Sequence, residues 1–254
     1  LGVAQHIYYD HLNNNRKVGS KKNDSMNGCY LGKSYTNSEI KDFLNLQKIN
    51  YVEYESEQKF IEKISNYIIA GKVIGWHQGR MEFGPRALGN RSIIADPRNE
   101  NMQKILNEKI KFRESFRPFA PSILKEELNN YFDFNSFDSP YMLFVADLKK
   151  EFRLNQSDDD NLFGLEKLNF IRSMLPAITH VDFSSRIQTV DKKTNPKFYK
   201  LLQNFGKKTG YPILVNTSFN IRGEPIVCSP EDSYNCFIKT NMDILALGNF
   251  IISK

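Results

Sequence analysis

The sequence is poor in cysteine, histidine and tryptophan, and it has no long hydrophobic run. Its three cysteines are odd in number and lack C-x-x-C spacing, which argues against a zinc site and a disulfide framework. Its four histidines include no H-E-x-x-H, so we expect no metal ligands in this chain. No stretch approaches the ~20 apolar residues that span a bilayer, and no signal segment opens the chain. These absences predict a non-membrane protein of the cytoplasm.

The chain has 254 residues, of which 40% are hydrophobic and 25% charged. This length suits one large domain, or one domain with an appendage, and the composition argues against disorder. The chain begins with Leu1 rather than Met, and apolar residues then recur at helical spacing: Val3, Ala4, Ile7 and Tyr8. We therefore expect a C-terminal piece of a larger protein, with a helix and linker over residues 1–27 and a main domain over residues 28–254.

The formal charge of +6 is concentrated in one part of the chain. Residues 78–125 contain ten Lys or Arg against five Asp or Glu, which leaves +5 in this stretch. A basic stretch is often only a solvated surface, but such a surface carries Lys at helical spacing. Here Arg is set among Gly and Pro, in G-R-M-E-F-G-P-R-A-L-G-N-R-S at residues 79–92. Arg suits phosphate and carboxylate oxygens and Gly lets the backbone approach a ligand, so the pattern predicts an anion site.

Helical and strand-like patterns alternate without regular βαβ units, which predicts an α/β fold with a mixed sheet flanked by helices. Apolar periodicity, caps and stops predict helices over residues 1–15, 38–47, 55–70, 101–110, 125–132, 196–209 and 229–239. Short apolar runs predict strands over residues 73–76, 92–95, 142–146, 177–181, 186–190 and 211–215, and within 242–252.

Three further clusters combine polar donors with a turn or a strand end. They are K-F-R-E-S-F-R-P-F-A-P at residues 111–121, S-R-I-Q-T-V at residues 185–190 and N-T-S-F-N-I-R-G-E-P at residues 216–225. The last cluster follows an apolar strand, and its polar groups can bind a ligand or can merely form a turn. No P-loop, dinucleotide fingerprint or G-x-S-x-G elbow is present. The residue types favour holding and transferring phosphate over nucleophilic attack by the protein.

The stretch G-W-H-Q-G-R-M-E-F-G-P-R-A-L-G-N-R-S-I-I-A-D-P-R, residues 75–98, resembles the C-terminal region of O-carbamoyltransferases related to nodulation protein U and to antibiotic-carbamoylating enzymes. The likeness continues through F-R-P-F-A-P, P-A-I-T-H-V-D, R-I-Q-T-V and N-T-S-F-N with G-E-P-I-V. It implies that residues 28–254 form a YrdC-like domain with a twisted mixed sheet. It also implies that residues 1–27 end an N-terminal, metal-containing domain of the actin-like ATPase superfold.

The resemblance further implies a two-step reaction. In this family the YrdC-like domain makes carbamoyl adenylate from ATP and carbamoyl phosphate, and the N-terminal domain passes the carbamoyl group to an acceptor hydroxyl. This chain would carry only the first step, with Mg²⁺ borne by the triphosphate and without the metal of the N-terminal domain. The partners we expect are these two substrates, an unidentified acceptor and the N-terminal domain, but neither a membrane nor nucleic acid.

Residue-by-residue matching within the motifs implies the site. Lys111, Arg117 and Arg86 are the expected catalytic residues, through contacts to the reacting phosphates. Further substrate-binding residues are expected at Arg80, Glu82, Arg91, His180, Arg186, Asn216, Ser218, Asn220 and Ser229. Two roles stay open for Glu82, which either orients a neighbouring arginine, Arg80 or Arg86, or touches magnesium or the ribose. The histidines His77 and His180 are either acid–base groups or structural, and Trp76 is expected in the core.

Two other hypotheses stay open. One is a YrdC-like RNA-binding or tRNA-modification module, because aromatic rings interleave with the cations of the basic stretch: Phe83, Phe112, Phe116 and Phe119. The Pro and Leu neighbours of these rings favour a core position instead. The other hypothesis is a structural domain that only closes over an upstream site, which predicts no ATP binding by the isolated chain.

Overall fold

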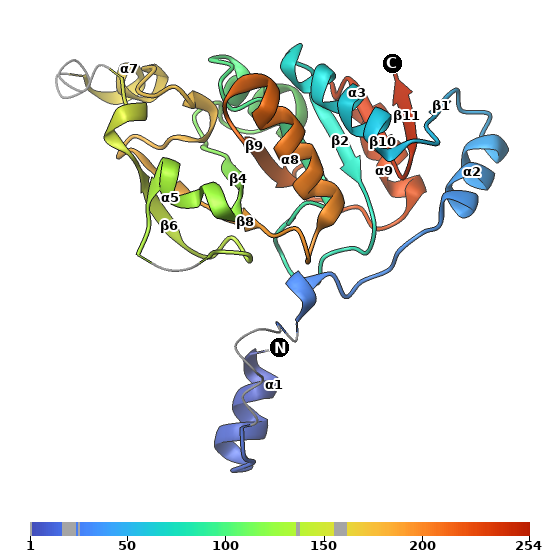
Figure 1. Ribbon diagram of the computed structural model, residues 1–254, viewed down its shortest axis with the longest axis horizontal. Coiled ribbons are helices and arrows are strands. Elements are labelled where there is room, and N and C mark those ends of the chain that lie inside the picture. The colour runs from blue at the N-terminus through green and yellow to red at the C-terminus, as the bar shows by residue number, and fades with distance from the viewer. Residues whose placement is uncertain (1, 17–23, 25, 136–137, 155–161) are drawn as a thin grey trace.

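The computed structural model describes residues 2–16, 24, 26–135, 138–154 and 162–254. Its centre is an eight-stranded mixed sheet with helices on both faces (Figure 1). The strands of this sheet are β1 (Val52–Glu53), β2 (Ile74–His77), β3 (Arg91–Ala95), β4 (Ala120–Leu124), β8 (Gln188–Val190), β9 (Ile213–Ser218), β10 (Ile244–Leu247) and β11 (Phe250–Ser253). Their spatial order is β1-β11-β10-β2-β3-β9-β4-β8, in which β10 and β2, and also β4 and β8, run parallel. The predicted α/β class is confirmed.

The helices of the described chain are α1 (Gly2–His6), α2 (Asn37–Leu46), α3 (Glu57–Ile69), α4 (Met102–Leu106), α5 (Leu128–Tyr131), α7 (Gly164–Asn169), α8 (Pro196–Thr209) and α9 (Pro230–Lys239). Side-chain caps begin four of them: Thr36 forms a capping box with Glu39 at α2, Ser56 caps α3, Asn195 caps α8, and Ser229 forms a second box with Asp232 at α9. The sequence therefore sets these helix starts locally, by satisfying backbone N–H groups that the first turn leaves free.

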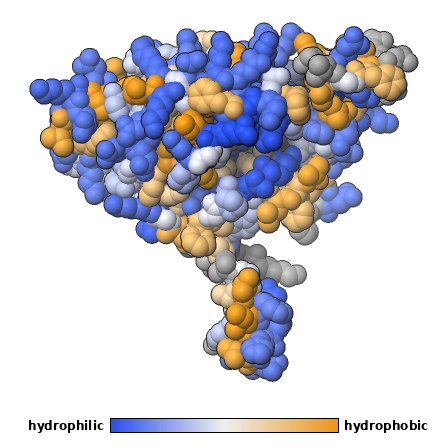
Figure 2. All heavy atoms as spheres, turned by 180° about the vertical axis from the view of Figure 1, so that it is seen from behind, coloured by the Kyte–Doolittle hydropathy of each residue, from blue (hydrophilic) through white to orange (hydrophobic). Residues whose placement is uncertain are grey.

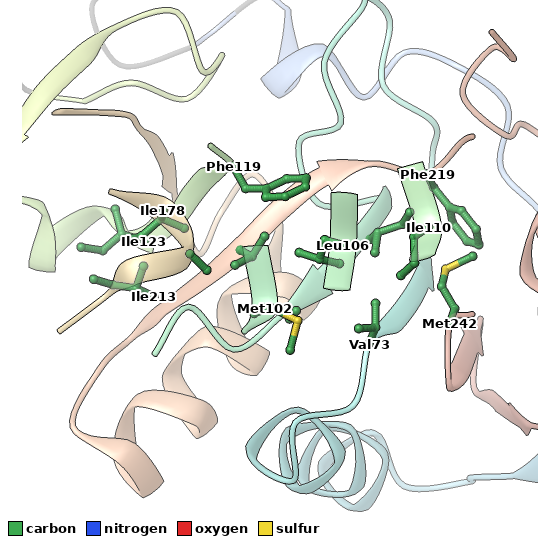
Figure 3. Close-up of a cluster of buried hydrophobic side chains, with 14 of the residues drawn as sticks. Val73, Met102, Leu106, Ile110, Phe119, Ile123, Ile178, Ile213, Phe219 and Met242 are labelled. Carbon is green, nitrogen blue, oxygen red and sulfur yellow. The ribbon is translucent and has the colours of Figure 1, made fainter. Parts of the chain in front are cut away.

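Two hydrophobic cores lie on opposite faces of the large sheet, because successive strand residues point in opposite directions. Ile94 and Trp76 pack with α3 and α8 in one core, whereas Ile93 packs with α4 and α9 in the other. Figure 3 shows part of the second core, where Met102 and Leu106 of α4 lie against strand residues. Trp76 is fully buried, which confirms its expected place in the core.

A second, three-stranded sheet lies beside the first and consists of β5 (Phe132–Asp133), β6 (Val145–Leu148) and β7 (Ser184–Arg186). The single strand predicted over residues 186–190 is divided between the two sheets. Arg186 ends β7, which pairs with β6, whereas β8 begins at Gln188 and pairs with β4. The chain thus crosses from one sheet to the other at Ile187, and Arg186 lies at the junction.

Two other predicted elements differ from the structure. Residues 177–181 form no strand: a short helical turn occupies Pro176–Ile178, because a proline at the first position favours helical geometry. The strand predicted over residues 142–146 begins only at Val145, since Met142 has a φ of 55°, outside the extended region.

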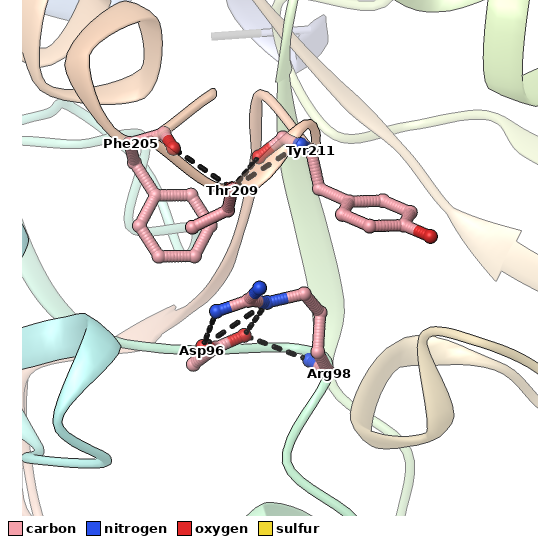
Figure 4. Close-up of polar contacts among 5 residues, drawn as sticks. All are labelled: Asp96, Arg98, Phe205, Thr209 and Tyr211. Atoms are coloured by element: carbon pink, nitrogen blue, oxygen red, sulfur yellow. Dashed lines mark hydrogen bonds and ion pairs between the residues drawn. The ribbon is translucent and has the colours of Figure 1, made fainter. Parts of the chain in front are cut away.

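Arg98, the last residue of the long motif, forms an ion pair that fastens the chain after β3. Its Nε and Nη2 donate to Asp96, with an Nη2–Oδ2 distance of 2.6 Å (Figure 4). The guanidinium also lies over the ring of Phe205 on α8, 5.3 Å from its centroid. In the same view Thr209 donates to the Phe205 carbonyl and closes the last turn of α8. This arginine therefore joins a strand end to a helix rather than facing a ligand.

Helix α1 stands apart from the body of the protein (Figure 1) and buries none of its residues. Figure 2 shows hydrophobic residues along one side of this N-terminal segment, and the exposed large hydrophobic residues within residues 2–16 are Val3, Ile7, Tyr8 and Leu12. Residues 17–23 and 25 of the predicted linker lie outside the described chain, and the domain boundary near residue 28 stays a prediction. None of the described helices is long and apolar enough to cross a membrane.

Candidate functional site

A cavity of about 160 Å³ opens where β9 meets the segments before β4 and after Gly84. We call it the arginine cavity, because three of its lining residues are arginines and, among the described residues, no Asp or Glu lines it. Its lining consists of Pro85, Arg86, Ala87, Arg113, Pro118, Phe119, Ala120, Met142, Arg186, Asn216, Thr217 and Ser218. Four of the predicted site residues are thus brought together from distant parts of the sequence: Arg86, Arg186, Asn216 and Ser218.

The arginines of this cavity are crowded and only partly satisfied. Burial, and then the charge of Arg86, lower the pKa of Arg186. The Nε of Arg186 is buried without a hydrogen-bond partner in the described structure, and its Nη2 meets only the sulfur of Met142, at 3.8 Å. A buried donor without an acceptor costs about 1–3 kcal/mol, and like charges repel. An anion in the cavity would relieve both penalties.

Arg113 was missed as a site residue, although it is the middle cation of K-x-R-x-x-x-R. Its Nε donates to Asn107 Oδ1 at 2.6 Å, and its guanidinium lies 5.0 Å from the ring centroid of Phe119. Asn107 in turn donates to the carbonyls of Ser115 and Arg117, at 2.9 and 2.8 Å. Arg113 is therefore held in a fixed direction at the cavity wall. The only sequence signal was its position between two predicted cations.

Asn216 anchors the polar end of β9 to its neighbours. Its Nδ2 donates to Gln188 Oε1 at 2.7 Å, to Ser122 Oγ at 3.0 Å and to the Ala87 carbonyl at 3.2 Å. Its Oδ1 is buried without a partner in the described structure. This side chain therefore ties β4, β8 and the Pro85–Ala87 segment to β9, and it leaves one free acceptor beside the arginines.

Lys111 is buried and does not line the arginine cavity. Its Nζ donates to the carbonyl and the Oγ of Ser218 and to the carbonyl and Oδ1 of Asn220, with a distance of 2.9 Å to the last. Burial, and then the charge of Arg113, lower the pKa of Lys111 to about 7. In the described structure its donors are thus directed to Ser218, the last residue of β9, and to Asn220 in the turn that follows. Ser218 also lines the arginine cavity. Arg117 is exposed and pairs with Glu114 at 3.1 Å.

A second cavity of about 410 Å³ adjoins the first and shares Arg186 and Pro118–Ala120 with it. It contains the predicted residue His180, whose Nδ1 lies 3.2 Å from Oδ1 of Asp182. Asp182 also accepts from the backbone N–H and the hydroxyl of Ser184, at 3.0 and 2.6 Å. Burial acts to raise the pKa of Asp182, but these hydrogen bonds outweigh it and lower the pKa. His180 is thereby fixed at the edge of a space next to Arg186.

Five other predicted residues line neither cavity, and one of them, Asn220, accepts from Lys111. Arg91 is fully buried and donates only to backbone carbonyls within the described chain, among them Gln78 at 2.7 Å. Arg80 is exposed and donates to the carbonyl of Leu31 at 3.3 Å. Ser229 accepts from the Asp232 backbone N–H as the cap of α9. Glu82, the fifth, accepts from backbone N–H groups through Oε1, its Oε2 is buried without a partner, and no ion pair joins it to Arg80 or Arg86 in the described structure.

His77 and the phenylalanines of the basic stretch were also candidates. His77 is buried, with Nδ1 2.7 Å from the Ser233 hydroxyl, and burial lowers its pKa well below the ordinary value. The expectation that the rings belong to the core is confirmed for Phe119 and wrong for three others, which are exposed: Phe83, Phe112 and Phe116. Phe112 follows a helical turn with a φ of 49°, and its ring is half exposed.

The chain is similar to several known proteins. Over its whole length it is 53% identical to an uncharacterised protein of Synechocystis sp., of which it covers 41%. Over 80% of its length it is 41% identical to nodulation protein NolNO of Sinorhizobium fredii, of which it covers 28%. Over 67% of its length it is 38% identical to the 3'-hydroxymethylcephem-O-carbamoyltransferase of Amycolatopsis lactamdurans, of which it also covers 28%. The chain thus spans less than half the length of these relatives.

The family model for the carbamoyltransferase C-terminus matches residues 65–254. This range includes the whole arginine cavity and the adjoining cavity with His180. It also contains every residue that the motifs implicated in binding or catalysis. The chain belongs to the carbamoyltransferase C-terminus family.

Proposed function

We propose that the arginine cavity binds phosphate groups of ATP and carbamoyl phosphate, and that the chain forms carbamoyl adenylate there. The observation that carries this proposal is the convergence of Arg86, Arg113 and Arg186 on one small cavity without a lining carboxylate. A relative that acts as an O-carbamoyltransferase supports the class of reaction. The predicted phosphate contacts of Lys111 and Arg117 are part of this proposal.

In the proposed reaction, ATP, carbamoyl phosphate and water become carbamoyl adenylate, pyrophosphate and phosphate. Several phosphate groups must approach one another, and fixed cations offset their repulsion and the charge that develops during transfer. Asn216 and Ser218 add polar groups at the same wall. Arginine side chains held by packing and hydrogen bonds, as Arg113 is, need little reorganisation when the ligand arrives.

Magnesium enters this proposal with the nucleotide. The described residues contain no group of three or more His, Cys, Asp or Glu that could hold a metal ion. The chemistry of the cavity lining fits an anion, whereas Mg²⁺ prefers oxygen ligands and is commonly bound through substrate phosphates. Bound in that way, it would neutralise charge on the triphosphate.

Transfer of the carbamoyl group to a hydroxyl acceptor is the second part of the proposal, and we assign it to an upstream domain. The relatives are more than twice as long as the part that this chain covers. A cytoplasmic location is likewise part of the proposal, since ATP and carbamoyl phosphate are metabolites of that compartment.

The test is carbamoyl-phosphate-dependent release of pyrophosphate from ATP by this chain. The proposal predicts release that requires both substrates and Mg²⁺. ATP binding in calorimetry without any pyrophosphate release would show that the reaction needs a further domain in addition to this chain. A chain that neither releases pyrophosphate nor binds ATP would contradict the proposal and favour a structural domain that closes over an upstream site.

Exposed aromatic rings favour one second candidate, an RNA-binding module. Phe112 and Phe116 are exposed and are sequence neighbours of Arg113 and Arg117. Proteins bind single-stranded RNA with such combinations of aromatic rings, which stack on bases, and cations, which contact phosphates. RNA affinity would fall steeply with added salt, in proportion to the phosphates neutralised. A salt-independent response or an absence of RNA binding would exclude this candidate.

A further inference from the structure

The carboxyl group of Glu82 organises the loop that carries Arg86. Its Oε1 accepts from three backbone N–H groups, those of Leu88 at 2.8 Å, Asn90 at 2.7 Å and Arg91 at 3.2 Å. Glu82 is only 4% exposed, so these bonds form away from water. One side-chain oxygen of residue 82 thus links the start of this loop to its end, at residues 88–91.

The segment between these ends projects outward and delivers Arg86 to the arginine cavity. Residues 83–86 are exposed, whereas residues 87–91 are buried. Pro85, Arg86 and Ala87 all line the cavity. Arg86 itself has no ion pair in the described structure, so nothing on its own side chain fixes its position. Its place depends on the backbone of the loop.

From this geometry we infer that Glu82 is a positioning residue, which sets the direction of Arg86 through the loop backbone rather than by touching a ligand. The inference rests on the proposed function, in that Arg86 is taken to bind phosphate. It replaces the ion-pair role that the sequence left open for Glu82, because Oε1 accepts from the loop and no ion pair joins Glu82 to Arg80 or Arg86 in the described structure. The other oxygen, Oε2, is buried there without a partner. Hydrogen bonds to a charged acceptor are roughly twice as strong as neutral ones, which suits a loop that must hold a cation near other cations.

Neighbouring side chains brace the buried end of the same loop. The Leu88 carbonyl accepts from Tyr30 Oη and from Gln188 Nε2, each at 2.7 Å. The Gly89 carbonyl accepts from Trp76 Nε1 at 2.8 Å. These contacts hold the base, but they leave three buried N–H groups that only Glu82 satisfies in the described structure. A substitution of Glu82 should therefore change the backbone of this loop and, with it, the position of Arg86.

A double-mutant cycle tests this inference, with inorganic phosphate as the probe and isothermal titration calorimetry as the measurement. The variants of the full chain are Glu82→Gln, Arg86→Ala and the combination. Arg86→Ala should weaken phosphate binding by about tenfold, the loss of one charge-assisted hydrogen bond. Glu82→Gln should also weaken binding, and the combination should bind no more weakly than Arg86→Ala alone.

Two results would overturn the inference. One is unchanged phosphate binding in Glu82→Gln; the other is an equal further loss when that change is added to Arg86→Ala. If Glu82→Gln does not fold, Glu82→Asp takes its place in the same cycle, since it keeps the charge but shortens the reach. Glu39→Gln is the matched control, because Glu39 also accepts a backbone N–H, from Thr36, and lines neither cavity.

The cycle separates this inference from the proposed reaction. Coupled phosphate binding without pyrophosphate release would support the role of Glu82 and contradict carbamoyl adenylate formation by this chain. Pyrophosphate release with uncoupled phosphate binding would do the reverse. Absence of phosphate binding by the unmodified chain would overturn the inference.

Discussion

At the scale of single residues, two arginines of the same motif have opposite environments. Arg91 is buried, and its guanidinium is saturated by backbone carbonyls, whereas Arg86 is exposed at a cavity. Burial lowers the pKa of Arg91 to about 10. The sequence presents both as Arg near a Gly and could not separate them, because tertiary packing decides that Arg91, which begins β3, is buried, and that Arg86, in the loop before it, is exposed. An arginine within a predicted binding motif can thus be a scaffold residue.

Lys111 gives a pH-dependent prediction. Burial lowers its pKa to about 7, from an ordinary value of 10.5, and Arg113 adds to the shift. An unfolded chain restores the ordinary value, so between about pH 7 and 10.5 the unfolded state binds more protons than the folded state. The free energy of unfolding should therefore rise with pH in this window, by at most about 1.4 kcal/mol per pH unit from this group.

Urea unfolding of the unmodified chain and Lys111→Met at pH 7 and pH 9 measures this effect. The stability of the unmodified chain relative to the variant should be greater at pH 9 than at pH 7. Other titrating groups, including the buried Lys197, are present in both proteins and cancel. An equal difference at the two pH values would show that Lys111 keeps its ordinary pKa in the folded chain.

At the scale of elements, prediction succeeded where the signal is local. The helices predicted over residues 55–70, 196–209 and 229–239 match α3, α8 and α9 to within two residues at each end. It failed where tertiary pairing decides, as at Ile187, where the chain leaves one sheet for another. A continuous run of residues with strand propensity does not indicate which sheet each half joins.

Gly89 supplies a prediction about the loop before β3. Its φ is 105°, and a Cβ there would lie 2.3 Å from Cδ1 of Phe198 on α8. Gly89→Ala should therefore lower the free energy of unfolding by about 3 kcal/mol or more, through backbone strain and displacement of a packed ring. Urea unfolding monitored by circular dichroism would show this loss.

Gly223→Ala is the matched control for that experiment. Its φ of 84° is also left-handed, but a Cβ there meets nothing within 4 Å. It should lose only the backbone part, about 1 kcal/mol. Equal losses in the two variants would mean that close packing of Gly89 against Phe198 contributes nothing.

At the scale of the whole molecule, the candidate site is an assembly of segments that are far apart in the sequence. Arg86 precedes β3, Arg113 precedes β4, Arg186 precedes β8 and Asn216 lies in β9, and they meet because these four strands are neighbours in the sheet. The family resemblance implied a site role for three of these four residues, since Arg86, Arg186 and Asn216 each lie in a matched motif. It could not show that Lys111 faces inward to Ser218, because this depends on how the turn after α4 packs against β9.

The most direct test of the central claim, that the arginine cavity activates carbamoyl phosphate, is pyrophosphate release by Arg186→Ala. Arg16→Ala is the control, since Arg16 is an exposed arginine that lines neither cavity. By analogy with the loss of one oxyanion-hole donor, Arg186→Ala should reduce the rate by on the order of 10²-fold, with Arg16→Ala unchanged. Full activity in a folded Arg186→Ala variant would contradict the account.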